Sequence, residues 1–360
     1  MIEITSQECR FIYPLALPEI TVIITCYNYS KFLIAAAKSV QDQTYPNFEC
    51  LVVDDCSTDD SFDKISDFIR ETDDSRFRCL RLGKNLGQMG AIKAGIENST
   101  APFIVLMDAD DLIITDFLKT HLEAHLNSSF SAALTASDTI QINEHGHILE
   151  STFHSLSKFR THSEEDAKIK EIPTDALGNI FDNHITFKKR PASIRYIEPY
   201  AEGWNVVAMS SLMFRRDVLE LIMPDNVDRL RICADFYLVT YAHSIAGTIT
   251  ISESLSAFRM HRKNNFSFNP ILGGRHLPGH FPSEHSDLIR REIANHIVIQ
   301  FDILSRVLGA ARCNDMIARY GPIKNVSSAE TQSSPLENGR GRKTRRGLGF
   351  FKRTFESAKS

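Results

Sequence analysis

Between residues 18 and 126, short apolar runs alternate with stretches of helical pattern, and this alternation constrains the fold more than any other feature. The apolar runs are nearly continuous, which is typical of strands buried on both faces. Strands that alternate with helices favour a parallel sheet covered by helices. We therefore predict an α/β fold with a mostly parallel central sheet flanked by helices. The expected elements are strands at 20–25, 48–53, 77–82 and 103–107 and helices at 32–43 and 90–97.

Polar side chains follow three of these strands at the point where each strand ends. In sheets of this kind, ligands bind beyond the carboxyl ends of the strands. Any one of these polar ends can be a turn or a helix cap, but three at one edge of a sheet indicate a binding site. The residues, strand by strand, are Thr25, Tyr27 and Asn28, then Asp54 and Asp55, then Asp108, Asp110 and Asp111.

The most informative short motif is Asp108-Ala109-Asp110, directly after a buried strand. Two carboxylates one residue apart can hold a hard divalent cation such as Mg²⁺ or Mn²⁺, which leaves coordination positions for phosphate oxygens. The alternative is that Asp110 or Asp111 caps a helix. The hydroxyl, amide and carboxylate groups at the other two strand ends suit a nucleobase and a ribose, and Tyr27 can stack on the base.

Composition excludes some classes of protein. A formal net charge of −4 argues against a protein that binds nucleic acid through bulk electrostatics. Seven cysteines are scattered singly without C-x-x-C spacing, which suits a reducing cytosol. The N-terminal residues lack the pattern of a signal peptide, and no run of about 18 apolar residues occurs. We expect a cytoplasmic protein without a spanning helix and without a nucleic-acid partner.

The motifs at the strand ends, taken together, resemble those of the family 2 glycosyltransferases with the GT-A fold, whose central sheet is Rossmann-like. About a hundred residues carry the resemblance, in the expected order. It implies a nucleotide-sugar donor bound by the first half of the chain and a divalent metal between the D-x-D motif and the diphosphate. The matching pieces are Ile24-Thr25-Cys26-Tyr27-Asn28, Gln43-x-Tyr45-Pro46, Val53-Asp54-Asp55-Cys56-Ser57-Thr58-Asp59, Asn85-x-Gly87-x-x-x-Ala91 and Asp108-x-Asp110-Asp111.

The resemblance also implies roles for single residues in the first half. Asp110 would bind the metal, and Asp108 would face the ribose or the sugar. Cys56 departs from the family, which most often has glycine there, so the backbone of that turn is expected to differ. The residues implied to bind the nucleotide-sugar are Thr25, Tyr27, Asn28, Asp54, Asp55, Asn85, Gly87, Asp108 and Ala109.

The second half carries the implied acceptor side. Family members usually have an acidic pair that opens a helix and supplies the catalytic base; here Ala234 stands at the first position and Asp235 at the second. Asp235 is therefore the expected base, and the alternative is that it caps a helix at 236–242. His261 matches a closing histidine that completes the metal shell. Trp204 would stack on the acceptor sugar or, alternatively, pack in the core.

Five regions are expected along the chain. Strands are predicted at 132–136 and 210–214, and residues 288–312 have the apolar spacing of one amphipathic helix. The last region mixes cations with aromatic residues, so it is either a solvated tail or a segment that binds an anionic membrane surface. The regions are an N-terminal arm (1–17), a nucleotide-sugar half (18–126), an acceptor half (127–265), a C-terminal helical extension (266–324) and a flexible basic tail (325–360).

The expected activity is metal-dependent transfer of a sugar, with inversion, from a nucleotide diphosphate donor, a UDP-sugar, to a hydroxyl of a glycan or lipid-linked glycan. The second candidate, a nucleotidyltransferase, would need a glycine-rich basic loop after the first strand, and residues 26–30 offer none. The third is a catalytically silent nucleotide- or sugar-binding module at a membrane surface, to which Ala234 points. A dehydrogenase is disfavoured because no G-x-G-x-x-G follows the first strand.

Overall fold

The computed structural model describes residues 16–150, 194–201, 208–262, 264 and 283–321. Two predictions, the acceptor-side Trp204 and the basic tail at 325–360, lie outside the described residues. The chain divides into two units, 1–321 and 322–360, and every element below belongs to the first.

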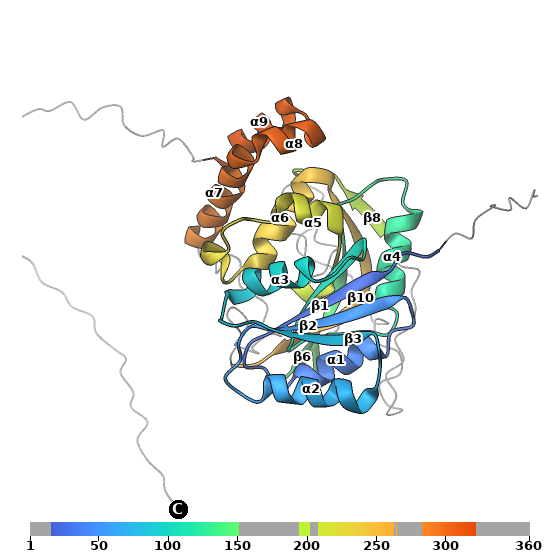
Figure 1. Cartoon of the computed structure of the whole chain (residues 1–360). Coiled ribbons are helices and arrows are strands. Elements are labelled where there is room, and N and C mark those ends of the chain that lie inside the picture. The colour runs from blue at the N-terminus through green and yellow to red at the C-terminus, as the bar shows by residue number, and fades with distance from the viewer. Residues whose placement is uncertain (1–15, 151–193, 202–207, 263, 265–282, 322–360) are drawn as a thin grey trace, which may run out of the picture. The chain divides into compact units, whose positions relative to one another are not determined.

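The order of elements follows the predicted alternation of strands and helices (Figure 1). The elements are β1 (Ile20–Cys26), α1 (Leu33–Gln41), β2 (Phe48–Asp54), α2 (Ser61–Thr72), β3 (Phe77–Arg81), α3 (Gly87–Glu97), β4 (Phe103–Asp108), β5 (Leu112–Ile113), α4 (Phe117–Asn127), β6 (Leu134–Asn143), β7 (Ile148–Glu150), β8 (Ile194–Ile197), the 3₁₀ turn η3 (Met209–Ser211), β9 (Leu212–Arg215), α5 (Arg216–Ile222), the 3₁₀ turn η4 (Asp228–Leu230), α6 (Ala234–Ala246), β10 (Thr248–Met260), α7 (Ser283–Ile299), α8 (Phe301–Leu308) and α9 (Ala310–Tyr320).

One sheet joins these strands in the order β3-β2-β1-β4-β9-β6-β10-β5, with β7 beside β6 and β8 beside β10. The first four strands run parallel to one another. β9 runs antiparallel to both β4 and β6, and β6 and β10 are again parallel. The predicted α/β fold and its central sheet are confirmed.

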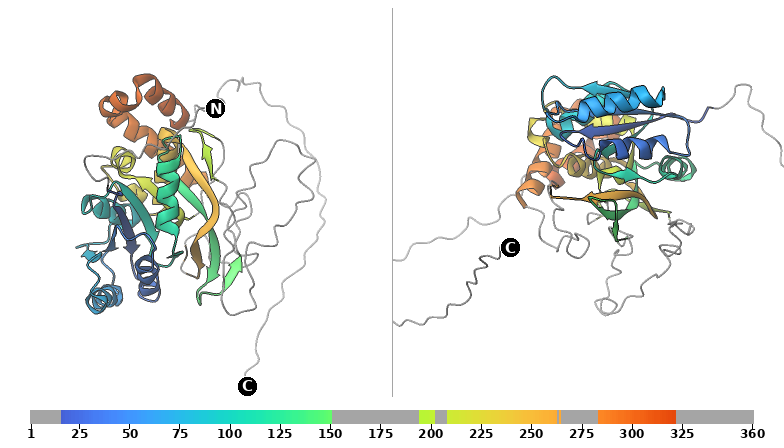
Figure 2. Two further views of the ribbon diagram at one scale, coloured as in Figure 1. Left: turned by 90° about the vertical axis from the view of Figure 1, so that its right-hand side faces the viewer. Right: turned by 90° about the horizontal axis from the view of Figure 1, so that it is seen from below.

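Alternate side chains of the sheet feed two apolar cores, one on each face. In β1, Ile23 packs in the core that contains α3, α5 and α6, whereas Val22 and Ile24 pack in the core that contains α1, α2 and α4. Each face of the sheet is thus covered by helices (Figure 2). Burial on both faces is the reason why these strands are apolar at every position.

Two strands of the second half differ from prediction. β6 begins two residues later than the predicted strand at 132–136 and continues to Asn143. The predicted strand at 210–214 begins as a 3₁₀ turn and becomes β9 only from Leu212. The 13-residue strand β10 was not predicted, because its polar residues interrupt the apolar run.

The predicted single helix at 288–312 is wrong. The chain forms three helices there, with breaks at Gln300 and Gly309. Gly309 has φ of 88°, in the left-handed region that glycine adopts without steric cost, so it ends α8 and starts α9. Apolar spacing alone cannot reveal such a break because it continues through all three helices. Within the described residues, no helix is both long enough and apolar enough to cross a membrane.

Candidate functional site

Parallel register brings the three predicted strand ends to one edge of the sheet. Thr25 of β1 pairs with Asp108 of β4, and Cys26 pairs with Asp54 of β2. Two backbone hydrogen bonds continue this alignment beyond the strands: Ala109 N–H donates to the Thr25 carbonyl, and Asp55 N–H donates to the Cys26 carbonyl. The polar ends are therefore neighbours, as the sequence predicted.

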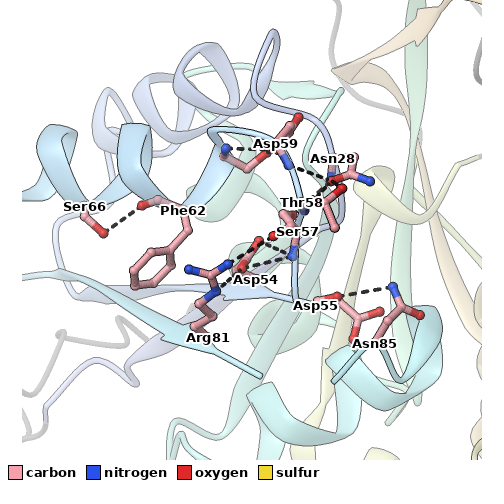
Figure 3. Close-up of polar contacts among 11 residues, drawn as sticks. Asn28, Asp54, Asp55, Ser57, Thr58, Asp59, Phe62, Ser66, Arg81 and Asn85 are labelled. Carbon is pink, nitrogen blue, oxygen red and sulfur yellow. Dashed lines mark hydrogen bonds and ion pairs between the residues drawn. The ribbon is translucent and has the colours of Figure 1, made fainter. Parts of the chain in front are cut away.

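Asn28 ties the loop after β1 to the loop after β2 (Figure 3). Its Oδ1 accepts hydrogen bonds from the N–H groups of Thr58, at 2.8 Å, and Asp59, at 3.2 Å. Its own N–H donates to Ser57 Oγ at 2.9 Å. Asn28 has φ of 61°, a conformation that asparagine tolerates better than most residues. Its amide oxygen is thus occupied in holding the two loops together.

Asp54 is 1% exposed and holds the turn that follows β2. Its carboxylate accepts a hydrogen bond from Ser57 N–H at 3.2 Å and lies 3.4 Å from Arg81 Nε (Figure 3). The Arg81 guanidinium in turn covers the ring of Phe62. Cys56, inside this turn, has φ of 60°, which explains why glycine suits the position.

Asp55 holds the start of α3. Its carboxylate accepts hydrogen bonds from the N–H groups of Leu86, at 2.6 Å, and Gly87, at 2.8 Å. Asn85 Nδ2 donates to the Asp55 carbonyl, and the Arg231 guanidinium donates to Asn85 from the other side. Gly87 has φ of 78°, and a Cβ there would lie 2.7 Å from Arg231 Cα, so only glycine fits. This loop is therefore fixed from both sides.

Tyr27 differs from its neighbours in the same predicted set. It is 43% exposed, whereas Thr25 and Asn28 are half-buried and Asp54 and Asp55 are buried. An exposed ring at the carboxyl edge of the sheet can stack on a planar ligand.

Three carboxylates crowd the end of β4. Asp111 is 1% exposed, and its oxygens accept hydrogen bonds from Arg259 N–H, at 2.9 Å, and from the Ser210 hydroxyl, at 2.8 Å. Ser210 Oγ also accepts the N–H of Asp108, at 3.0 Å. Burial, followed by the charges of Asp110 and Asp108, raises the pKa of Asp111 well above its ordinary value. Asp111 thus links β4, β10 and the residues that precede β9, which is more than capping a helix.

Asp110 lies beside His261, although the two residues are 151 positions apart in the sequence. This proximity agrees with the prediction that both bind one metal ion. Asp110 Oδ2 and His261 Nε2 are 2.8 Å apart, and both residues are 8% exposed. The His261 ring stacks on Phe32 with centroids 5.0 Å apart, and the backbone N–H of His261 donates to Asn264 Oδ1. Arg259 Nε donates to the Asp110 carbonyl at 2.7 Å. The imidazole and carboxylate are thus held in place from several sides.

The donor set suits a divalent cation. Burial first, then the charges of Asp110 and Asp235, raise the pKa of Asp108 to about 7. A cation would offset this crowding of negative charge. The described residues hold no group of three or more histidine, cysteine or acidic side chains that could bind a metal. Asp110 and His261 would therefore be two ligands of a shell completed by water and phosphate oxygens, which is the usual arrangement for Mg²⁺.

Asp235 lies in the first turn of α6 and is not its N-cap. The N-cap is Cys233, which has φ of 60° and makes no side-chain capping bond. Asp235 is therefore not the N-cap residue, although its carboxylate accepts backbone hydrogen bonds from Phe236 and from Asp235 itself in the first turn. Burial raises the pKa of Asp235, and its charge in turn raises that of Asp108, so these two carboxylates are near each other.

Gln88 connects these two carboxylate positions, and sequence analysis missed it. Its Nε2 donates to Asp108 Oδ1 at 3.1 Å, and its Oε1 accepts the N–H of Ala234 at 3.2 Å. Its backbone N–H donates to the Arg231 carbonyl at 2.9 Å. The one signal in the sequence is a polar residue directly after the glycine of the Asn85-x-Gly87 motif, at the start of a helix.

Part of the chain matches a known protein family. Residues 21–189 match the family model described as glycosyl transferase family 2. The chain carries a family 2 glycosyltransferase domain. The resemblance read from the motifs is thereby confirmed, whereas the roles of the single site residues remain predictions.

Two curated proteins are similar to this chain over part of their length. An uncharacterized glycosyltransferase of Nostoc sp. is 29% identical over 248 residues, which are 69% of this chain and 66% of that protein. The Escherichia coli protein named UDP-Glc:alpha-D-GlcNAc-diphosphoundecaprenol beta-1,3-glucosyltransferase WfaP is 32% identical over 96 residues, 27% of this chain and 37% of that protein. The match thus spans less than two thirds of either relative.

Among solved structures, S. aureus TarS 1–349 in complex with UDP is similar to this chain with a TM-score of 0.51. The alignment covers 84% of this chain and 70% of that one at 16% identity. At this identity the likeness concerns the fold alone, and it agrees with the GT-A type of fold expected for a family 2 glycosyltransferase domain.

Proposed function

We propose that the protein is a glycosyltransferase that moves a sugar from a nucleotide diphosphate donor to a hydroxyl group of a glycan or lipid-linked glycan. One observation carries the proposal: Asp110 contacts His261, and Asp108 ends the neighbouring strand β4, at the carboxyl edge of the parallel strands of a family 2 domain. Hard oxygen ligands with one imidazole at this edge suit a metal-bound diphosphate.

The donor is proposed to be a UDP-sugar. Tyr27 would stack on the base, Thr25 and Asp108 would approach the ribose and sugar, and Asp110 with His261 would hold Mn²⁺ or Mg²⁺. When bound, such a cation stabilises the negative charge of the leaving diphosphate. Two similar proteins support uridine: TarS is in complex with UDP, and WfaP is named for UDP-Glc.

Asn28, Asp54, Asp55, Asn85 and Gly87, which were predicted to contact the nucleotide, are proposed to border the donor pocket mainly by shaping its loops. Their polar groups hold backbone N–H and carbonyl groups of the loops after β1 and β2 and before α3. The backbone of Ala109, next to Thr25, belongs to the same edge.

Asp235 is proposed to be the catalytic base. It would accept the proton of the acceptor hydroxyl as that oxygen attacks the anomeric carbon and the diphosphate leaves from the opposite side, which inverts the configuration. A carboxylate whose pKa is raised by burial is better matched to this task at neutral pH than an exposed one. Trp204 would contact the acceptor sugar.

The acceptor is proposed to be presented at a membrane. WfaP is named for a diphosphoundecaprenol substrate, and the residues from Arg340 to Arg353 mix cations with Phe350 and Phe351. Such a segment binds anionic surfaces. We expect the full chain to float with anionic liposomes whose lipid composition matches that of the inner leaflet. A chain that ends at Asn325 should float less. Equal flotation of the two chains would contradict a membrane contact through the tail.

Calorimetric titration with UDP tests the proposal, once with Mn²⁺ and once with EDTA. We expect binding that requires the metal and is lost in Asp110→Asn. UDP-sugars would then be screened for UDP release with glycan and lipid-linked acceptors. Metal-dependent binding without release from any donor would favour the silent module, to which Ala234 points.

A further inference from the structure

We propose that Gln88 is a positioning residue that sets the catalytic base Asp235 relative to the donor-side carboxylate Asp108. This inference rests on the proposed function, because it assigns a role in the same reaction. Gln88 itself would contact neither the donor sugar nor the acceptor. It acts through the helix that carries Asp235.

Helix α6 depends on Gln88 for its first N–H group. The first N–H groups of a helix have no partner within the helix and need one outside it. The N-cap Cys233 supplies none from its side chain, and Ala234, where the family often has an acid, has no polar side chain. Gln88 Oε1, from α3, accepts the Ala234 N–H instead. The start of α6 is thus capped from a distant part of the sequence.

The other end of the same amide reaches the donor side. Gln88 Nε2 donates to Asp108 Oδ1 at the end of β4. An amide is both a donor and an acceptor, so one rigid planar group connects the strand with the D-x-D motif to the residue before Asp235. Glutamate could keep only the acceptor half, and methionine, of similar length, could keep neither.

Gln88 can fix the distance between Asp108 and the start of α6 because its own backbone is held in place. Its N–H donates to the Arg231 carbonyl, two N–H groups just before it bind the Asp55 carboxylate, and Gly87 packs against Arg231 without space for a Cβ. The loop therefore cannot shift independently of β2 or of the segment before α6. Reaction rates are sensitive to such distances, since a misplacement of about 1 Å can cost about 100-fold.

Four variants of the full chain test the proposal: Gln88→Met, Gln88→Glu, Asp235→Asn and the double variant Gln88→Met with Asp235→Asn. Lys93→Met is the matched control, because Lys93 also ties α3 to the segment before α6, through the Pro224 and Asp225 carbonyls, but contacts neither carboxylate. We expect Q88M to lower kcat by about 100-fold, with KM for the UDP-sugar and calorimetric affinity for UDP with Mn²⁺ within about threefold of wild type. K93M should keep the wild-type kcat.

Hydrogen exchange gives a readout that does not depend on turnover. The Ala234 amide should exchange about tenfold faster or more in Q88M, and at the wild-type rate in K93M and in Q88E, which retains the acceptor oxygen. Q88E should nevertheless lose kcat, because its carboxylate cannot donate to Asp108 and repels it. Unchanged exchange at Ala234 in Q88M, or wild-type kcat in Q88M, would overturn the proposal.

The double variant separates positioning from a merely structural role. If Gln88 acts through Asp235, Q88M should cause no further loss of turnover in the D235N background. An additional loss of the same size would overturn the proposal. Failure of the proposed function has a different signature: the wild type would release no UDP from any donor, or D235N would keep full turnover, while exchange at Ala234 would still rise in Q88M.

Discussion

Two groups of acidic and amide side chains lie at the same edge of the sheet, yet they are used differently. In the first, after β1 and β2, Asn28, Asp54 and Asp55 bind backbone N–H groups of neighbouring loops. In the second, after β4, the charges of Asp110 and Asp235 add to burial and raise the pKa of Asp108 to about 7. The first group contacts backbone N–H groups, whereas in the second Asp108 and Asp110 contact the side chains of Gln88 and His261 and crowd each other with negative charge.

The difference teaches how to separate residues that build a site from residues that use it. A carboxylate that accepts hydrogen bonds from backbone N–H groups has its charge compensated, so its loss affects folding. Carboxylates that raise one another's pKa store unfavourable charge that a cation or substrate can compensate. Substitutions in the first group should therefore lower stability more than turnover, and substitutions in the second group should lower turnover more than stability.

The largest effect is expected for Asp110→Asn. Turnover should fall by about 10²–10³-fold, as for the loss of one electrostatic stabiliser of a transition state, because the proposed metal loses a charged ligand. Thermal stability should be unchanged or higher, since the substitution removes one negative charge from the crowded group. UDP release and thermal melting of the same preparations measure both, and a large drop in the melting temperature would contradict the distinction.

Asp55→Ala should show the reverse pattern. It leaves the N–H groups of Leu86 and Gly87 without their carboxylate partner, at an expected cost of about 2 kcal/mol in the free energy of unfolding. Urea denaturation measures this value. Asp60→Ala is the control, because Asp60 lies nearby in sequence in an exposed ion pair with Lys64 and its loss should change stability far less. Equal losses in the two variants would break the comparison.

A buried histidine tests the pH dependence of stability away from both groups. His125 is 3% exposed, and its Nδ1 has no hydrogen-bond partner among the described residues. Burial lowers its pKa to about 4. Between about pH 6.5 and pH 4 the unfolded chain therefore binds a proton that the folded chain does not, and stability falls as the pH falls.

His125→Gln should reduce this slope by up to about 1.4 kcal/mol per pH unit. Urea denaturation at a series of pH values measures the slope for wild type and variant. The site carboxylates act in the other direction, since a raised pKa makes the folded state gain stability as the pH falls toward the ordinary value. An unchanged slope in the variant would show that other groups govern the acid limb.

The smallest effect is expected for Ser210→Ala. The Ser210 hydroxyl donates to Asp111 and accepts the Asp108 N–H, so it links the crowded group to the start of β9. Its loss should cost about 1 kcal/mol of stability and lower turnover only slightly, because Asp111 keeps its bond from Arg259. Melting and UDP release, measured with threonine at the same position as a hydroxyl-retaining control, give both quantities.

The local parts of the fold could be predicted from the sequence. β1, β2 and β4 were found within one residue of their bounds, because strands buried on both faces must be apolar throughout. Their polar ends met at one edge because parallel strands share a direction, and neither inference needs a contact between distant residues. Helices α7, α8 and α9 were harder to predict from the sequence, since a break such as Gly309 leaves the apolar spacing intact.

The sequence by itself thus determined the parallel strands β1 to β4, their polar edge and the family of the domain. Only the tertiary structure decided how each polar residue is used. Asp54 and Asp110 look alike as aspartates after apolar strands, but one faces backbone N–H groups and the other faces further carboxylates and His261. The contact of Gln88 with Ala234, across 146 positions, depends on how α3 and α6 pack. Charge compensation depends on neighbours in space, which no local pattern records.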